Sequence, residues 1–297
     1  MTVMSLRLGS AVAILGLGLP LLSSPPAPAA PGRVAVPTLT SVAAQHVGKV
    51  DRVTFGFTNG LPAHVHLEWV DTLVHDGSGL PVRVAGAKVL MVGFNTATAH
   101  DQNGATTRTR TAYALPNVIT SVGAGDFEGY VTVGLGVQKR TSYTVTKLQN
   151  PDRVVVDVRA GFPTTTRKIW LVDTDAVETG NGPSFVSRPR PIRSDAPAAA
   201  ALHAMFAGPT PQERADGLRL VRSHAWGFDD LRIADGIARV RLTRGCNSDG
   251  STVTVAGEMA PTLRQFHTVD WVKIYGPGGG TEQPTGATDS IPVCLEP

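Results

Sequence analysis

Short segments rich in valine, isoleucine, threonine and aromatic residues recur through the first half of this 297-residue chain. Pairs that favour tight turns separate them, such as Asn59-Gly60 and Asn150-Pro151. No stretch of this half repeats its apolar residues every 3.6 positions, as a sustained helix would. The pattern predicts an all-β sandwich or barrel. The expected strands span residues 52–57, 64–70, 88–94, 129–137, 142–148 and 153–158.

The second half carries signals for helices as well as strands. Ser194 and Asp195 precede Pro197 and an alanine-rich run, which is the order of an N-cap, a proline at the first helical position and a good helix former. This helix should end at the Gly-Pro pair that follows the run. A second helix is expected over residues 251–266, with Pro261 kinking or breaking it.

A hairpin is expected around Asp235-Gly236, because this pair favours a two-residue turn and lies between two apolar segments. The flanking strands are expected at residues 228–233 and 237–242, and another strand at 269–275. Since helices and strands both occur, this half is predicted to be an α+β domain.

The first thirty or so residues have the order of a secretory signal peptide. Arg7 precedes an uncharged apolar run from Ala11 to Leu22, and residues rich in proline, alanine and serine follow. The run is shorter than the about 20 residues that a permanent membrane helix needs. We therefore expect cleavage near Ala29 or Ala30, and a protein that is secreted or associated with the cell envelope.

Composition places the rest of the chain among ordinary globular proteins, with 42% hydrophobic and 17% charged residues. No later segment is apolar for long enough to span a membrane. The net charge is only +3, and the basic residues form no long run. Nucleic acid is therefore not an expected partner, whereas a loose attraction to anionic envelope polymers stays open.

The chain has two cysteines, Cys246 and Cys294. One pair offers too few ligands for a typical zinc site, and an exported protein meets an oxidising compartment. We expect the two to form a disulfide.

Candidate metal and acid-base residues each have a simpler interpretation. His64 and His66 alternate on an expected strand and would supply half of a metal site. A third ligand would have to come from His75 or Glu68, so solvated histidines are the simpler account. No metal or cofactor is expected.

Adjacent Asp229 and Asp230 should point to opposite faces of a regular strand, and so should not act as a catalytic pair. Glu128 is expected to be solvated at a hairpin in which Phe127 packs. The chain has no Gly-x-Ser-x-Gly elbow. We therefore identify no catalytic residue.

The tryptophans have two interpretations. Exposed indole rings commonly stack on sugars, which would indicate glycan binding. Burial is the commoner fate on strands, so at least two are expected in the core. They are Trp69, Trp170, Trp226 and Trp271.

Three segments of the first half resemble the AMIN-like domain of exported envelope proteins. They are DRVTF at residues 51–55, GDFEG at 125–129 and LQNPDRVVVDV at 148–158. The resemblance implies a small β-sandwich that places proteins in the cell wall or periplasm, often beside amidases that cut peptidoglycan. It supplies no established catalytic residue.

The second half resembles the GerMN domain, which is found in sporulation and germination proteins and in many exported bacterial lipoproteins. The segments that carry the resemblance are AAAAL at 198–202, FAGPT at 206–210, GL at 217–218, DGIARV at 235–240 and VDWVKI at 269–274. Together the two resemblances indicate an exported envelope protein of the actinobacterial type. The lipobox cysteine of many relatives is missing.

These signals predict five segments along the chain. Residues 1–30 are the signal peptide, 31–46 a flexible tether, 47–160 the AMIN-like sandwich, 161–167 a linker and 168–297 the GerMN-like α+β domain.

The predicted function is that of an exported, non-catalytic binding or scaffolding protein of the cell envelope. Its expected partner is peptidoglycan or an envelope protein, and its ligand-binding residues are unknown. The alternative is a cell-wall hydrolase or accessory factor that uses unrecognised carboxylates.

Overall fold

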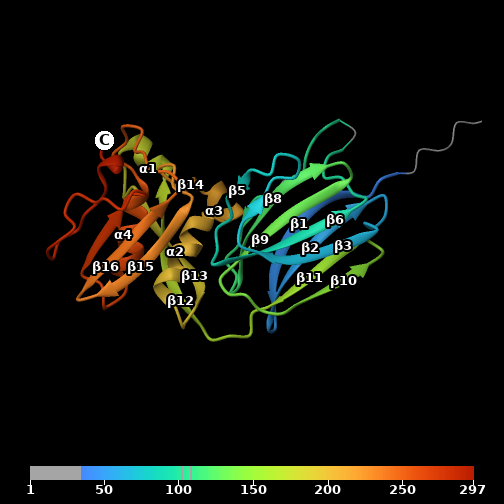
Figure 1. Ribbon diagram of the computed structural model, residues 1–297, viewed down its shortest axis with the longest axis horizontal. Coiled ribbons are helices and arrows are strands. Elements are labelled where there is room, and N and C mark those ends of the chain that lie inside the picture. Colours follow the sequence, from blue (N-terminus) through green and yellow to red (C-terminus); the bar gives the residue numbers. More distant parts are fainter. Residues whose placement is uncertain (1–34, 102, 108) are drawn as a thin grey trace, which may run out of the picture. The chain divides into compact units, whose positions relative to one another are not determined.

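The computed structural model describes residues 35–101, 103–107 and 109–297. Its first part is a sandwich of two antiparallel sheets (Figure 1). One sheet has the order β1-β2-β11-β10, with β1 (Thr38–Val47), β2 (Val50–Thr58), β11 (Arg153–Arg159) and β10 (Tyr143–Leu148). The other has the order β3-β6-β9-β8-β7, with β3 (His64–Val70), β6 (Lys88–Asn95), β9 (Tyr130–Val137), β8 (Val118–Phe127) and β7 (Thr111–Ala112). A small pair completes this part, β4 (Leu73–Val74) and β5 (Pro81–Val82).

Alternating burial along β2 shows why this part folds as a sandwich. Every second residue points inward, and Val53 and Phe55 are fully buried. Phe55 and Phe57 meet Phe94 of the facing sheet edge to face, with ring centroids 4.9 and 5.3 Å apart. All six strands expected in the first half are confirmed within a few residues.

The tether expected at residues 31–46 is wrong from residue 38 onward, because β1 occupies this stretch. β1 pairs antiparallel with β2 over its whole length, and Leu39 is fully buried. Val42 and Ala44 pack against the same core. An apolar residue on the inner face and a full ladder of hydrogen bonds hold the segment in place.

The second part contains two three-stranded sheets and the helices. One sheet has the order β13-β12-β14, with β13 (Phe185–Arg193), β12 (Thr164–Asp173) and β14 (Leu218–Arg219). The other has the order β15-β16-β17, with β15 (Gly227–Ala234), β16 (Ile237–Thr243) and β17 (Trp271–Tyr275). The helices are α1 (Thr174–Thr179), α2 (Pro197–Ala207), α3 (Pro211–Ala215), α4 (Val255–Arg264) and the short 3-10 helix η1 (Val293–Leu295). The linker expected at 161–167 is wrong in its second half, because β12 begins at Thr164 and pairs with β13.

Helix α2 begins at Pro197 as predicted, but its N-cap is Ala196 and no side chain caps it. Asp195 is engaged elsewhere, by Arg193 at 2.6 Å and Lys139 at 3.1 Å. The expected break at Pro261 does not occur, since α4 continues through it to Arg264. The hairpin at Asp235-Gly236 is confirmed.

Each part has its own hydrophobic core. The sandwich core gathers residues from Leu39 to Val158, and the second core gathers residues from Ile169 to Leu295 around α2 and α4. Ala85, from the loop after β5, packs in the second core. Residues 35–297 thus form one compact unit. No helix in the part of the chain that the structure describes has the length and apolarity to cross a membrane.

Candidate functional site

Arg110 is bonded to the backbone of Arg83, and the charge of Arg222 acts on both; we call these three residues the arginine cluster. Arg83 follows β5, Arg110 precedes β7, and Arg222 lies between β14 and β15. Their backbones are held by buried neighbours at residues 82, 112 and 225. The cluster therefore projects from packed segments of both parts of the chain.

Backbone carbonyls orient two members of the cluster. Nη1 and Nη2 of Arg110 each donate to the carbonyl oxygen of Arg83 at 3.2 Å. Nη1 of Arg83 donates to the carbonyl of Phe206, near the end of α2, at 3.4 Å. These bonds leave donors on both guanidinium groups unused.

The three positive charges oppose one another. The pKa of Arg83 falls from its ordinary value to about 9, mainly because its guanidinium is buried and further because Arg222 and Arg110 are close. Partial burial and Arg222 also lower the pKa of Arg110. A pKa of about 9 keeps Arg83 charged at neutral pH.

No carboxylate among the described residues forms a salt bridge with the cluster. Residues 1–34, 102 and 108, which the structure does not describe, include no aspartate or glutamate. Elsewhere, five arginines pair with acids, namely Arg52, Arg190, Arg193, Arg241 and Arg264. Arg83 is half-buried, whereas Arg110 and Arg222 are exposed, and none of the three is paired with a carboxylate among the described residues.

Three hollows adjoin the cluster. The first, of about 210 Å³, is lined by Arg83, Trp226 and Arg244 among others. The second, of about 320 Å³, is lined by Arg110 and Arg214.

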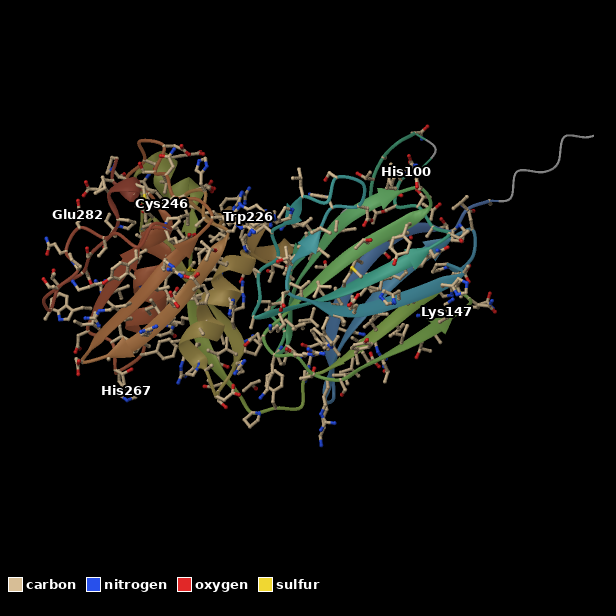
Figure 2. All side chains as sticks on the ribbon, viewed as in Figure 1. His100, Lys147, Trp226, Cys246, His267 and Glu282 are labelled. Carbon is tan, nitrogen blue, oxygen red and sulfur yellow. A yellow bond between two sulfur atoms is a disulfide. The ribbon has the colours of Figure 1, made fainter. Side chains whose placement is uncertain are left out.

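The third hollow, of about 660 Å³, is lined by Arg222, His224 and Trp226. Figure 2 shows nitrogen-bearing side chains gathered around Trp226, which borders the first and third hollows. Each hollow thus contains one arginine of the cluster and a second basic side chain.

Aromatic rings border the first hollow. The guanidinium of Arg244 lies 5.2 Å from the ring of Trp226, a cation-π contact. The imidazole of His203 lies 4.7 Å from the ring of Phe228. Burial, and secondarily the charge of Arg193, lowers the pKa of His203 to about 4, so this histidine is neutral at pH 7.

The expected core positions of the tryptophans are wrong. Trp69, Trp170 and Trp226 are half-buried, and Trp271 is 38% exposed. Each indole ring keeps part of its surface in water, so the stacking interpretation stays open for Trp226.

The expectation that Asp229 and Asp230 point to opposite faces of the strand is also wrong. A β-bulge shifts the register between Asp229 and Arg232, and Asp230 has a φ of 48°. Both carboxylates consequently reach Arg241, at 2.7 and 2.8 Å. They neutralise one cation rather than form an acid-base pair.

The hairpin at GDFEG is confirmed, with Glu128 and Gly129 in the left-handed region between β8 and β9. Phe127 is 52% exposed, so the expectation that it packs is wrong. His64 and His66 lie on the exposed side of β3, and His66 is 3.6 Å from Glu68. The described residues contain no group of three or more potential metal ligands.

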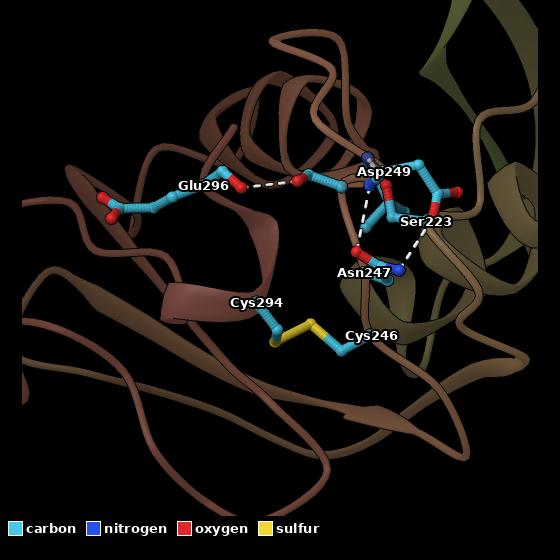
Figure 3. Close-up of a disulfide and its surroundings, with 8 residues drawn as sticks. Ser223, Cys246, Asn247, Asp249, Cys294 and Glu296 are labelled. Atoms are coloured by element: carbon cyan, nitrogen blue, oxygen red, sulfur yellow. Dashed lines mark hydrogen bonds between the residues drawn. A yellow bond between two sulfur atoms is a disulfide. The ribbon is translucent and has the colours of Figure 1, made fainter.

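The predicted disulfide between Cys246 and Cys294 is confirmed (Figure 3). It joins the loop after β16 to η1. Ser248 reinforces this junction, because its amide donates to the carbonyl of Cys294 at 2.8 Å and its hydroxyl to that of Glu296 at 2.5 Å. The predicted cleavage site at Ala29 or Ala30 lies outside the described residues.

Comparison with known proteins places the first part in a family. The AMIN-like domain family matches residues 37–160. A search of solved structures finds the tandem GerMN domains of the sporulation protein GerM from Bacillus subtilis, at 23% identity and a TM-score of 0.30. That match covers 45% of this chain and 46% of the GerM chain, which is less than half of each. No curated protein matches the sequence. The resemblance seen in the sequence is therefore confirmed for the sandwich: residues 37–160 match the AMIN-like domain family.

Proposed function

We propose that this protein is exported and serves as a non-enzymatic binding protein of the bacterial cell envelope, holding an anionic envelope polymer at the arginine cluster. The observation that carries the proposal is that Arg110 is bonded to the Arg83 carbonyl, that Arg83, Arg110 and Arg222 each line a hollow with a second basic side chain, and that none of them is paired with a carboxylate among the described residues. Arg83 is half-buried, where a positive charge without a counter-charge is unfavourable. A bound polyanion would supply the missing negative charge.

The AMIN-like match supports the envelope as the place of action, since this domain is typical of exported envelope proteins. The order of segments agrees with export: a signal peptide over residues 1–30, the AMIN-like domain to residue 160, and a GerMN-like α+β domain after the short linker. In this proposal the sandwich begins at β1 and the second domain at β12.

Glu258 bears on the alternative of a cell-wall hydrolase, because it is a fully buried carboxyl group. Its pKa is raised well above the usual value by burial, which outweighs hydrogen bonds from the amides of Val221 and Val172. A catalytic acid must touch its substrate, whereas Glu258 lines none of the three hollows. We assign it a structural role.

Sedimentation of the purified protein with cell walls tests the proposal. We expect the protein to pellet with walls that keep their anionic polymers, and to stay in solution at about 0.5 M salt, where surface charges are screened. Arg110→Gln/Arg222→Gln should reduce the pelleted fraction. The matched control is Arg159→Gln/Arg232→Gln, which removes the same charge from exposed arginines that form no salt bridge.

Equal loss of binding in both double variants would show that net charge alone is responsible and would refute the site. Release of soluble wall fragments during the incubation would support the hydrolase instead.

A further inference from the structure

The first hollow lies between the two parts of the chain. The sandwich lines it with segments that include Asp71 and Arg83. The second part lines it with α2 at His203, with Trp226 just before β15, and with Arg244 just after β16. Its volume of about 210 Å³ is smaller than the about 300 Å³ at which sites for drug-sized molecules begin. The hollow therefore suits one small unit of a larger ligand.

Three ring side chains line this hollow, namely His203, Trp226 and Phe228. The ring centroids of His203 and Phe228 lie 4.7 Å apart, and the ring of Trp226 lies 5.2 Å from the guanidinium of Arg244. A sugar ring has C–H groups on its faces and hydroxyl groups around its edge. Flat aromatic surfaces with a polar edge complement such a ring. The three rings thus favour a cyclic, hydroxylated ligand over an unbranched chain.

Polar groups that line the hollow keep unused hydrogen-bonding capacity. His203 is neutral at pH 7, so its imidazole has one donor and one acceptor. Thr243 adds a hydroxyl group and Trp226 an indole N–H. No side-chain hydrogen bond of these three residues occurs in the part of the chain that the structure describes. Sugar hydroxyl groups both donate and accept, so they match this set.

Arg83 adds a positive charge to the hollow. Its guanidinium is half-buried and donates one long hydrogen bond, to the carbonyl of Phe206 at 3.4 Å. Elsewhere in this chain a single guanidinium binds a single carboxylate, since Arg52 donates to both oxygens of Asp157 at 2.8 Å. A carboxylate on the ligand would satisfy Arg83 in the same way and supply the counter-charge that its half-buried position lacks.

The chain itself does not supply that carboxylate. Of the described residues that line the first hollow, only Asp71 is acidic. Asp71 is exposed and accepts a hydrogen bond from Lys88 at 3.0 Å. Arg244 adds a second positive charge to the lining. The hollow therefore combines an excess of positive charge with ring surfaces and free polar groups.

We propose that the first hollow binds one sugar unit that carries a carboxylate, which Arg83 holds while the rings of Trp226 and Phe228 contact the sugar. His203 bonds to one of its hydroxyl groups. This rests on the proposed function and narrows its polymer from any polyanion to a glycan with acidic sugars. Uronic acids and muramic acid share this chemistry, and the choice of probes distinguishes these two sources.

Titration calorimetry of the purified secreted protein tests the proposal at about 0.15 M salt. Two probes are acidic glycans: an oligoglucuronate, and glycan strands that contain N-acetylmuramic acid and are freed of peptide. Polyglutamate of equal charge number has the carboxylates without the sugar, and a neutral glucan of equal length has the sugar without the carboxylates. We expect one acidic glycan to bind about tenfold more tightly than either control, since each control lacks one contact. The tighter of the two acidic glycans identifies the source.

Arg83→Gln should weaken binding of the acidic glycan by about tenfold, the loss of one charge-assisted contact. It should leave the weaker binding of the neutral glucan unchanged. Arg83→Lys keeps the charge and removes the planar fork, so it should restore only part of the affinity. The control Arg232→Gln lies outside the hollow and should bind like the native protein. Circular dichroism confirms that each variant is folded.

Tryptophan fluorescence locates the ligand independently of the charge. Binding should shift the emission of the native protein, and Trp226→Leu should remove this shift and weaken binding by about fivefold. The matched control is Trp271→Leu, which removes a half-exposed indole from β17, outside the hollow, and should keep both the shift and the affinity. A shift that survives in Trp226→Leu would place the ligand elsewhere and overturn the proposal.

The possible failures are distinct. Polyglutamate that binds as tightly as both acidic glycans would overturn the need for a sugar and leave the proposed function standing. A neutral glucan that binds equally well, or an Arg83→Gln variant with native affinity, would overturn the role of the carboxylate. Wall sedimentation that is unaffected by Arg110→Gln/Arg222→Gln would instead refute the proposed function itself.

Discussion

Arg190 and the arginine cluster place the same side chain in opposite electrostatic surroundings. Arg190 is 3% exposed and is held by both carboxylate oxygens of Glu213. Arg83, Arg110 and Arg222 form no salt bridge with a carboxylate in the part of the chain that the structure describes. The first arrangement fastens α3 to β13. The second leaves three positive charges without a carboxylate, and only one of them, Arg83, is half-buried.

Glu258 is the counterpart of the cluster, because it is a carboxyl group without a cation. Its Oε2 atom is buried and has no hydrogen-bond partner in the structure. Burial raises its pKa. Burial alone would also raise the pKa of Glu213, but Arg190 outweighs it and the net shift is downward. Four variants test how the paired and the unpaired charges each affect the stability of the protein.

The largest effect is expected for Glu213→Gln. It leaves the Arg190 guanidinium buried without its counter-charge, which typically costs about 3 kcal/mol. Urea denaturation measures the change in the free energy of unfolding. A loss below about 1 kcal/mol would mean that the pair is no stronger than a surface ion pair.

Glu258 should make stability depend on pH. The folded protein holds this proton to a higher pH than the unfolded chain, where the pKa is about 4.5. Above that pH the folded state binds more protons, so stability falls as pH rises, by at most about 1.4 kcal/mol per pH unit. Glu258→Gln should flatten this slope in denaturation curves recorded from pH 4 to 8.

Glu213 should contribute a slope of the opposite sign, since its folded-state pKa is lowered. Its stabilising contribution is present above its unfolded-state pKa and is lost as pH falls. An unchanged pH profile in Glu258→Gln would contradict the assignment of a buried, protonated carboxyl group.

Ala215→Glu places a carboxylate beside the arginine cluster, so that the cluster comes to resemble the Arg190–Glu213 pair. Ala215 is exposed and lines the second hollow beside Arg110 and Arg214. We expect the new carboxylate to add up to about 1 kcal/mol of stability and to reduce the fraction of protein that pellets with cell walls. Ala215→Gln, measured by the same sedimentation and thermal methods, controls for the added side chain.

The smallest effect is expected for Arg222→Gln on stability. No side-chain hydrogen bond of Arg222 occurs among the described residues, whereas its charge opposes Arg83 and Arg110. Removing it should therefore stabilise the protein, by about 0.5 kcal/mol, or a rise of about 1 to 2 °C in Tm. A lower Tm would indicate an unrecognised structural role. Arg232→Gln should leave Tm unchanged.

Alternation of apolar residues predicted most of the sandwich, because one face of each strand is buried. The apolar pattern does not predict strand β8, because Gly123 and Gly125 are typical of turns rather than strands. Its glycines allow close approach, since a side chain at Gly125 would collide with Asp76. The start of β12 is not predictable for a related reason, because three threonines after a proline are typical of a linker.

The arginine cluster could not be predicted from the sequence. Its members lie in loops, far apart in the chain, and no local pattern distinguishes them from the arginines that find carboxylates. Asp229 and Asp230 illustrate the same limit, because the bulge that turns both toward Arg241 depends on pairing with β16. The disulfide was predictable because a lone pair of cysteines leaves little choice.

The packing of Ala85 in the second core has a consequence for how the chain matures. Ala85 is synthesised early. The residues that share its core, such as Phe206 and Ala225, follow more than a hundred positions later in the chain. Arg83 is therefore brought to Arg222 only after the two cores have joined. An anion bound by both arginines would bind only the assembled molecule and would therefore stabilise the joined cores against unfolding.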